Sequence, residues 1–321
     1  MTRFLASRLR HTALVALIVA TLAFVLVRAA PGDPFSIPEG VADPGAARAA
    51  LRAHYGLDAP LWRQYPTMLL SFARGEFGTS FASGAPVAEV VRQAIGRSFL
   101  LMAPALLIGA LLGTALGTWQ GWRRGRMADR VASVATTTVL AVPEFLIALA
   151  VSLLFAVRLR WFPATGMLTA GAASGSIVAQ VGDFVRHAVL PVGTLSVLIA
   201  AVVARFQRGA VAEALHEEFV RAARARGASR RTLVVHVLRR TAPALCTLLG
   251  LLAPSLVGGA ALVEFVFGWP GAGYALVNAV TGRDYPVVVA FVTVGAVAVC
   301  LSSAIADAMA AALNPRVRLD A

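Results

Sequence analysis

The segment FVRAARARGASRRTLVVHVLRR, residues 219–240, contains seven arginines and no acidic residue, and apolar stretches flank it on both sides. In the whole chain of 321 residues, 58% of the residues are hydrophobic and 14% are charged, and the mean hydropathy is +0.75. A soluble domain has about 25% charged residues. The composition therefore indicates a membrane-embedded protein, in which a segment this rich in arginine has to lie outside the lipid.

The charged residues divide the chain into pieces long enough to cross a bilayer. A spanning helix needs roughly 17 to 25 apolar residues, and these continuous runs lack the alternation of a membrane β-strand. Six runs qualify, one of them containing Glu144: 11–27, 98–122, 131–157, 187–204, 241–263 and 285–306. The predicted fold is therefore an all-α integral membrane protein with six transmembrane helices.

The arginines also predict the orientation. With the N-terminus inside, the inner segments hold 18 arginines and the two short outer loops hold four. Because basic residues are enriched in cytoplasmic loops, we expect both termini and residues 219–240 to be cytoplasmic. The net charge of +13 is explained in the same way, so we expect no nucleic-acid partner.

These spans divide the chain into three parts. Residues 1–29 form the cytoplasmic N-terminus and first helix, 30–97 an external segment, and 98–321 a core of five helices that includes a cytoplasmic loop, 205–242. Within the external segment, residues 43–73 are typical of two helices broken at GLDAP. We expect this small helical unit to pack on the outer ends of the spanning helices.

The long cytoplasmic loop has signals for a helix, a turn and a second helix. Residues 210–226 have helical spacing, Gly227 is suited to end that helix, and Ser229 is suited to cap the next. One side of the first helix gathers Leu215, Phe219, Ala222, Ala223 and Arg226. Two interpretations remain open at this point: a rigid projection that docks on another protein, or an amphipathic hairpin lying on anionic lipid.

Three acidic residues lie in or beside apolar runs, where an ionisable group usually faces protein or a water-filled cavity. Glu144 follows the helix-distorting Pro143, and we interpret it as a residue of the substrate pathway. Glu264 is either structural or part of a gate, and Asp307 is interpreted as a structural partner. An alternative function also follows from Glu144, namely a proton-coupled secondary transporter that uses it as a relay.

Catalytic motifs are missing from the sequence. All 29 basic residues are arginine, so the chain cannot contain the lysine of a phosphate-binding loop and does not hydrolyse ATP by that route. HEEFV (216–220) has Val220 where a zinc protease needs its second histidine. We therefore predict that the chain is not an enzyme and holds no cofactor or metal.

The arginine-rich segment resembles a known family signature. RAARARGAS is similar to the EAA motif of binding-protein-dependent ABC importers, with Arg221 in the place of glutamate, then Ala222 and Ala223, and Gly227 after three further residues. Other strings resemble, in order, the B-type membrane subunits of dipeptide, oligopeptide and nickel permeases: APGDP (30–34), YGLDAPLWRQY (55–65), GEFGTSFASGAPV (75–87), WFPATG (161–166), HAVLP (187–191), VEFVFGWPGAG (263–273), RDYPVV (283–288) and LNPRVR (313–318).

The chain departs from the pattern of this family at three places. Pro243 stands one residue early at the end of the loop, and LNPR replaces the common LDPR. Glu144 follows Pro143 where the family mostly has a small polar residue. The first two departures leave the class intact, whereas the third bears on the substrate.

The resemblance implies the type I permease fold of ABC importers, in the cytoplasmic membrane of a bacterium. It implies ATP-driven import of di- or oligopeptides or a related small solute, by alternating access. The implied partners are a second homologous permease subunit, two ATP-binding subunits that hold ATP and Mg²⁺, an extracytoplasmic solute-binding protein, and membrane lipid. The residues expected to couple the chain to the ATPases are Leu215, Phe219, Arg221, Ala222, Ala223, Arg226, Gly227 and Ser229.

Overall fold

The computed structural model describes residues 2–30, 33–35, 43–171 and 175–313, with side chains from residue 8 to residue 305 within these ranges. The described chain is helical between its turns and loops, with no β-strand. Its helices are α1 (Thr2–Ala29), α2 (Pro44–His54), α3 (Leu61–Ala73), α4 (Val87–Trp122), α5 (Met127–Ala141), α6 (Glu144–Val151), the π-helix η1 (Ser152–Arg158), α7 (Ile177–Ala214), α8 (Glu218–Ala225), α9 (Arg230–Leu252), α10 (Ser255–Gly258), α11 (Ala261–Val266), α12 (Ala272–Thr281) and α13 (Tyr285–Leu313). The LNPRVR motif after Leu313, the Pro31–Gly32 part of APGDP and the side chain of Asp307 lie outside the described residues.

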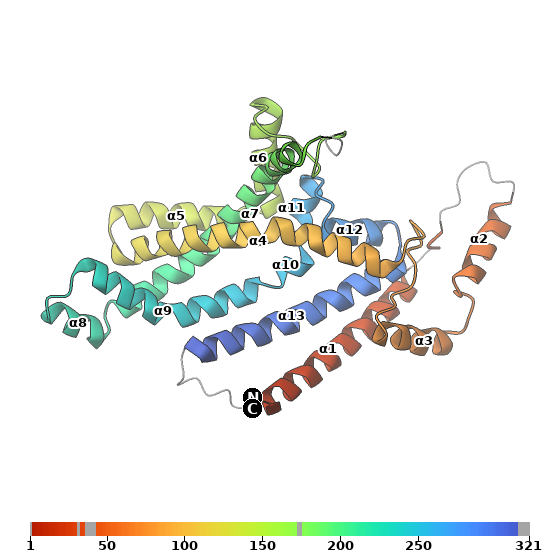
Figure 1. Cartoon of the computed structure of the whole chain (residues 1–321), viewed down its shortest axis with the longest axis horizontal. Coiled ribbons are helices and arrows are strands. Elements are labelled where there is room, and N and C mark those ends of the chain that lie inside the picture. The colour runs from red at the N-terminus through yellow and green to blue at the C-terminus, as the bar shows by residue number, and fades with distance from the viewer. Residues whose placement is uncertain (1, 31–32, 36–42, 172–174, 314–321) are drawn as a thin grey trace.

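Five helical stretches are long and apolar enough to cross a membrane: Arg8–Ala29, Val87–Trp122, Ile177–Ala214, Arg230–Val266 and Tyr285–Ile305. In Figure 1, α1, α4, α9 and α13 run along the long axis of the molecule, with α8 at one end and α2 and α3 at the other. The prediction of an all-α protein with several transmembrane helices is confirmed.

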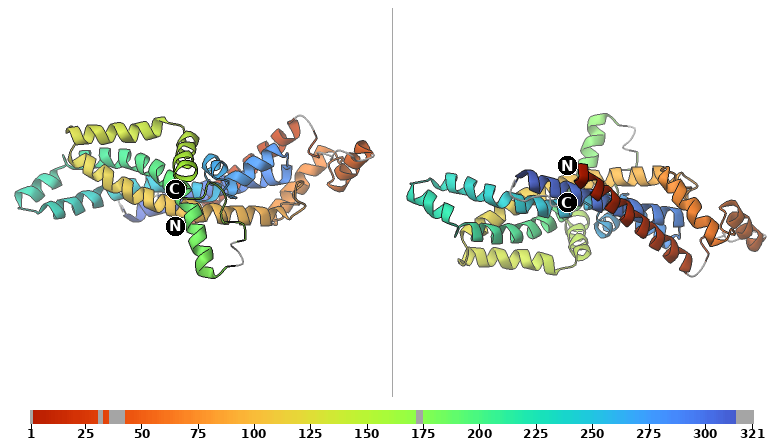
Figure 2. Two further views of the ribbon diagram at one scale, coloured as in Figure 1. Left: turned by 90° about the horizontal axis from the view of Figure 1, so that it is seen from above. Right: turned by 90° about the horizontal axis from the view of Figure 1, so that it is seen from below.

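The one predicted span that is not among these five stretches, residues 131–157, is not straight. The apolar run from 131 to 157 is broken between α5 and α6, whose axes differ by 100°, and Figure 2 shows α6 turned across the long axis. Val142 has extended backbone angles, as expected for a residue before proline, and Pro143 cannot donate the hydrogen bond that would continue the helix. A sixth crossing is thus available only through this bent pair.

α4 and α7 pack closely because α4 has glycines, which carry no side chain, where the two helices meet. Four buried glycines lie one above the other on α4: Gly109, Gly113, Gly117 and Gly121. A methyl group at any of the four would lie less than 3.0 Å from an α7 atom, and at Gly117 it would lie 2.4 Å from the Ala204 carbonyl oxygen. Small residues let helix backbones approach closely in a membrane. We call this contact the glycine seam.

Replacing Gly117 with alanine is expected to lower the thermal unfolding temperature of the detergent-solubilised protein. The added methyl meets backbone atoms of α7, and such overpacking costs about 1–3 kcal/mol. Gly96→Ala is the matched control, because Gly96 is on the same helix and nothing lies within 4 Å of the place that an added methyl group would take. Equal unfolding temperatures for the two variants would contradict the tightness of the seam.

The two helices predicted within residues 43–73 are confirmed as α2 and α3, separated at GLDAP. Asp43 caps α2 by accepting a hydrogen bond from the Ala46 amide at 2.9 Å. The unit contacts α1 directly, because the Thr21 and Tyr65 hydroxyls lie 2.7 Å apart. It reaches the start of α13 through the following loop, since Tyr55 packs on Phe81 and Phe81 packs edge-on against Tyr285. It thus packs on the ends of the spanning helices, as expected.

A buried carboxylate fixes the loop that follows this unit. Asp284, at the start of α13, accepts hydrogen bonds from the Ser80 hydroxyl and from the amides of Phe81 and Ala82, the latter two at 3.0 and 3.3 Å. This contact joins the GEFGTSFASGAPV and RDYPVV motifs, although about 200 residues separate them in the sequence.

The predicted helix over residues 210–226 is wrong. The spanning helix α7 continues to Ala214, the chain turns through 215–217, and α8 starts only at Glu218. The turn is stabilised locally, because the His216 ring nitrogen Nδ1 lies 2.7 Å from the Ala212 carbonyl oxygen. The predicted loop 205–242 is therefore mostly the ends of α7 and α9, and only the middle of it, with α8, connects them.

Candidate functional site

The connection through α8 has a hydrophobic core of its own. Side chains from α7, α8 and α9 form one buried cluster: Val211, Ala214, Val220, Ala223, Leu233 and Val237. Trp122 at the end of α4 packs against this cluster, as do Leu215, Phe219 and Ala228. We call this unit, residues 211–237, the α8 elbow. Because its helices share a packed core, the elbow projects as a stiff element at one end of the molecule (Figure 1).

The helix signals read from the sequence are confirmed in the elbow. Gly227 has φ +75°, the left-handed conformation that glycine adopts without strain. The amides of Gly227 and Ala228 donate to the carbonyls of Arg224 and Ala223, both at 3.0 Å, which is the hydrogen-bond pattern of a Schellman helix end. Ser229 caps α9 by accepting a hydrogen bond from the Thr232 amide at 3.3 Å.

The structure divides the eight predicted coupling residues between two faces. Ala223 is buried, and Leu215 and Phe219 are partly buried against the elbow's own core. The remaining five are exposed: Arg221, Ala222, Arg226, Gly227 and Ser229. Ala222 and Ala223, the pair that matches the two alanines of the EAA motif, therefore differ in exposure, and the surface open to a partner contains Ala222 and not Ala223.

An ion pair with a buried carboxylate joins α7, just before the elbow, to the start of α5. Arg208 on α7 donates Nε and a terminal nitrogen to the two carboxylate oxygens of Asp129, at 2.6 and 2.8 Å. Asp129, at the start of α5, is fully buried and also accepts the Gly125 amide at 2.9 Å. Sequence reasoning missed this pair; its one signal is that Asp129 is the only acid among the arginines of 123–130.

Asp129→Asn is expected to destabilise the protein by about 3 kcal/mol. Removing one partner of a buried pair typically costs 3–5 kcal/mol, and the lower end applies because 32% of the Arg208 side chain is exposed. Glu217→Gln is the control, since Glu217 pairs with Arg240 at the surface, where ion pairs contribute little. Denaturant unfolding measures both variants; an effect no larger for Asp129→Asn than for the control would contradict the anchoring role.

Glu264 lies inside a compact hydrogen-bonded unit between α4, α11 and α12. Its carboxylate is fully buried and accepts the Ser98 hydroxyl at 2.6 Å and the Tyr274 amide at 3.0 Å. Ser98 in turn accepts the Ala272 amide at 2.7 Å. A methyl group on Gly259 or Gly271 would lie 2.3 or 2.6 Å from the carboxylate of Glu264. Of the two interpretations left open by the sequence, this enclosure favours the structural one.

Glu144 lies at the bend between α5 and α6. It is the first residue of α6 and is half-buried, and among the described residues no hydrogen bond or ion pair to its carboxylate is present. The next turn of α6 packs on α11 through Ala148 and Val263. Glu144 and Glu264 therefore lie on neighbouring elements but in different surroundings, one partly open and one enclosed.

Comparison with known proteins identifies the family. Residues 98–319 match the binding-protein-dependent transport system inner membrane component, and residues 1–101 match the N-terminal part of such membrane components. The chain belongs to this family of ABC importer permeases. The membership confirms the resemblance carried by the EAA-like segment and decides against a proton-coupled secondary transporter.

Individual relatives cover almost the whole permease. A putative peptide permease protein from Brucella ovis is 36% identical over 307 residues, which are 94% of this chain and 95% of the relative. The glutathione transport system permease protein GsiC from Salmonella choleraesuis is 34% identical, covering 94% of each chain. The oligopeptide transport system permease protein AppB from Bacillus subtilis is 31% identical, covering 93% of this chain and 94% of AppB.

Proposed function

We propose that this permease is the non-catalytic membrane subunit of an importer for di- or oligopeptides or a small peptide-like solute such as glutathione. The α8 elbow is the observation that carries the proposal, because it is a stiff projection with an exposed, arginine-rich tip. The names of the relatives support the substrate class, since they are a peptide permease, a glutathione permease and an oligopeptide permease.

The proposed complex has further subunits. Two ATP-binding subunits hold ATP and Mg²⁺, a second homologous permease completes the membrane part, and an extracytoplasmic protein delivers the solute. This chain has no lysine for a phosphate-binding loop, so ATP hydrolysis has to take place on a partner. The exposed tip of the elbow is the part of this chain that we assign to the ATPase contact.

A displacement of the elbow moves the spanning helices, because the elbow is packed against them. The elbow's core joins α8 to α7 and α9, so a force on α8 displaces the ends of both helices. The ion pair between Arg208 and Asp129 carries the displacement to α5, and the glycine seam carries it to α4. Alternating access then results when ATP-driven closure of the partners shifts these helices together.

Gly227→Val tests the coupling role. A side chain at a left-handed position strains the backbone by about 1–2 kcal/mol and also enlarges the tip of the elbow. We expect membrane insertion to persist, while co-purification of the ATP-binding subunits and peptide uptake fall together. Gly75→Val is the control, because Gly75 also has a positive φ with free space around it but follows the end of α3. Equal losses for the two variants would refute a specific role of the elbow.

We propose that the α8 end of the molecule is cytoplasmic and the α2–α3 end external, in a bacterial cytoplasmic membrane. The excess of arginine in the loops at the α8 end supports this orientation. A topology reporter inserted near Arg230 should respond as cytoplasmic, and one near Asp58 as external. The reverse result at either position would refute the orientation and with it the docking of an ATPase on α8.

For Glu144 we propose a place in the substrate pathway, and for Glu264 a structural role. The carboxylate of Glu144 has no partner among the described residues and is half-buried, so it is available to a cationic group of a solute. Glu144→Gln should therefore reduce uptake of cationic peptides more than uptake of neutral peptides of the same length. If Glu144→Gln leaves the uptake of both peptides as it is in the unchanged protein, or lowers both by the same factor, Glu144 has no such role in the substrate pathway.

A further inference from the structure

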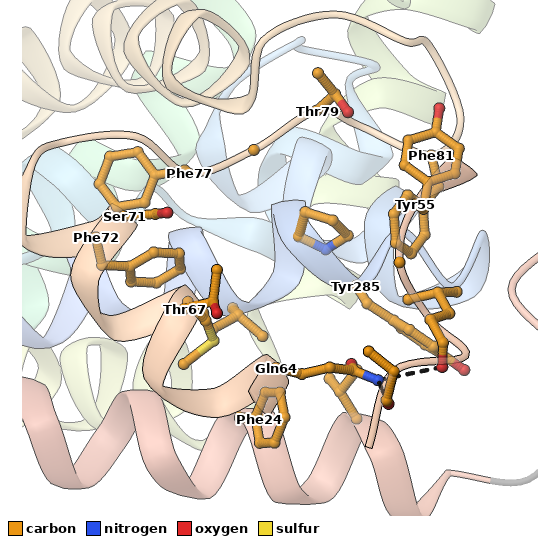
Figure 3. A pocket seen from close by; sticks show the side chains of 18 of the residues that line it. Phe24, Tyr55, Gln64, Thr67, Ser71, Phe72, Phe77, Thr79, Phe81 and Tyr285 are labelled. Carbon is orange, nitrogen blue, oxygen red and sulfur yellow. Dashed lines mark hydrogen bonds between the residues drawn. The ribbon is translucent and has the colours of Figure 1, made fainter. Parts of the chain in front are cut away.

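A cavity of about 570 Å³ lies between the α2–α3 unit and the ends of α1 and α13. Its wall combines side chains from segments far apart in the sequence, and Figure 3 shows Phe24, Tyr55, Phe72, Phe77, Phe81 and Tyr285 around it. Binding sites for small molecules range from about 300 to 1,000 Å³ and are mostly apolar with a few polar groups. The cavity is therefore suited in size and lining to one apolar or amphiphilic molecule.

The cavity wall contains two arginines, Arg28 and Arg63, and one acidic residue, Glu76, so its formal charge is positive. Arg28 is half-buried at the end of α1, donates a hydrogen bond to the Gln64 side-chain oxygen, and lies 5.6 Å from the ring centre of Phe24. No carboxylate among the described residues forms a salt bridge with it. The aromatic lining and this arginine together favour a ligand with an anionic group.

The cavity lies where the apolar part of the membrane ends. Arg28 is the next-to-last residue of the span Arg8–Ala29, and Tyr285 is the first residue of the span Tyr285–Ile305. Aromatic residues and arginine are typical of this boundary. A molecule bound here therefore meets both the acyl region and the headgroup region of the lipid.

The helix α3, which covers one side of the cavity, also has large apolar side chains that remain exposed among the described residues. Leu61, Trp62 and Leu70 are exposed by 56%, 69% and 61%, and Arg63 lies 4.7 Å from the ring centre of Trp62. Large apolar and aromatic side chains beside arginine are characteristic of helices that lie in the membrane interface. The side of the cavity formed by α3 thus borders lipid, which favours a lipid ligand over a water-soluble peptide.

We propose that this cavity binds an anionic phospholipid, with the phosphate on Arg28 and the first part of an acyl chain between the aromatic side chains. The lipid would join α3 to the ends of α1 and α13 and so fix the α2–α3 unit on the membrane surface. This proposal requires only that the chain spans the membrane, and it does not depend on the transported solute.

The test uses the full-length protein, purified in a neutral detergent together with any co-purifying subunits. Phosphatidylglycerol is titrated and the bound lipid is measured by native mass spectrometry. Arg28→Gln should weaken binding by on the order of tenfold, as expected for loss of one charge-assisted hydrogen bond. Arg10→Gln, at the opposite end of the same helix and exposed, should bind as the unchanged protein does.

A second pair of variants leaves the charge in place. Thr67 lines the cavity on α3, whereas Leu70 on the same helix is exposed and not part of its wall. Thr67→Trp should therefore fill the cavity and abolish lipid binding, and Leu70→Trp should leave it unchanged. This pair decides the question if Arg28→Gln does not fold.

Three further compounds show whether the cavity recognises a phospholipid, a free phosphate or a peptide. Diacylglycerol with the same acyl chains should bind much more weakly than phosphatidylglycerol, and neither inorganic phosphate nor a dipeptide should displace the lipid. Equal binding of diacylglycerol, displacement by phosphate or by the dipeptide, or full binding to both Arg28→Gln and Thr67→Trp would overturn the proposal.

Discussion

The close approach of α4 and α7 is the constraint on which the other contacts depend. Lipid tails are as apolar as the helix surfaces, so hydrophobicity does not hold spanning helices together, and close packing has to do so. The four glycines of the seam provide this packing along the second half of α4. Because the backbones touch, α7 cannot shift or rotate along α4 without atomic overlap. The position of the α8 elbow at the end of α7 is determined by this contact.

From the seam outward, each contact fixes the next. The ion pair between Arg208 and Asp129 attaches α7 to the turn before α5, and Trp122 at the end of α4 packs on the elbow. The elbow's core then joins α8 to α7 and α9, so its exposed tip is held by three spanning helices. At the other end, Asp284 holds the loop after α3. The chain therefore has a stiff tip at one end and a cavity-forming unit at the other.

Much of this architecture could be predicted from local patterns. Runs of apolar residues predicted the spans, and Gly227 and Ser229 predicted the end of α8 and the start of α9, because a left-handed residue and a cap are local requirements. The bend at Pro143 was also readable, since proline disfavours a helix at the preceding residue, but length alone suggested a straight span. The four glycines at intervals of four were equally visible and indicate close helix packing.

Other features depend on contacts between distant segments, which a single sequence does not contain. Helical spacing placed Ala222 and Ala223 on one side of a helix, but it could not show that Ala223 packs on α7 and α9. The partner of Asp129 is 79 residues away, and the cavity around Arg28 combines residues from 24 to 289. The enclosure of Glu264 likewise depends on Ser98, and only the folded chain distinguishes it from the more open Glu144.

The most direct measurement of the central claim is site-specific cross-linking from the elbow. Cys246 and Cys300, the two cysteines of the chain, are replaced by alanine, and one cysteine is introduced at position 222 or 223. In the assembled complex, a short thiol cross-linker should connect position 222, which is exposed, to an ATP-binding subunit, and should fail from position 223, which is buried. Failure from position 222 in an active complex, or stronger cross-linking from position 223, would contradict the account.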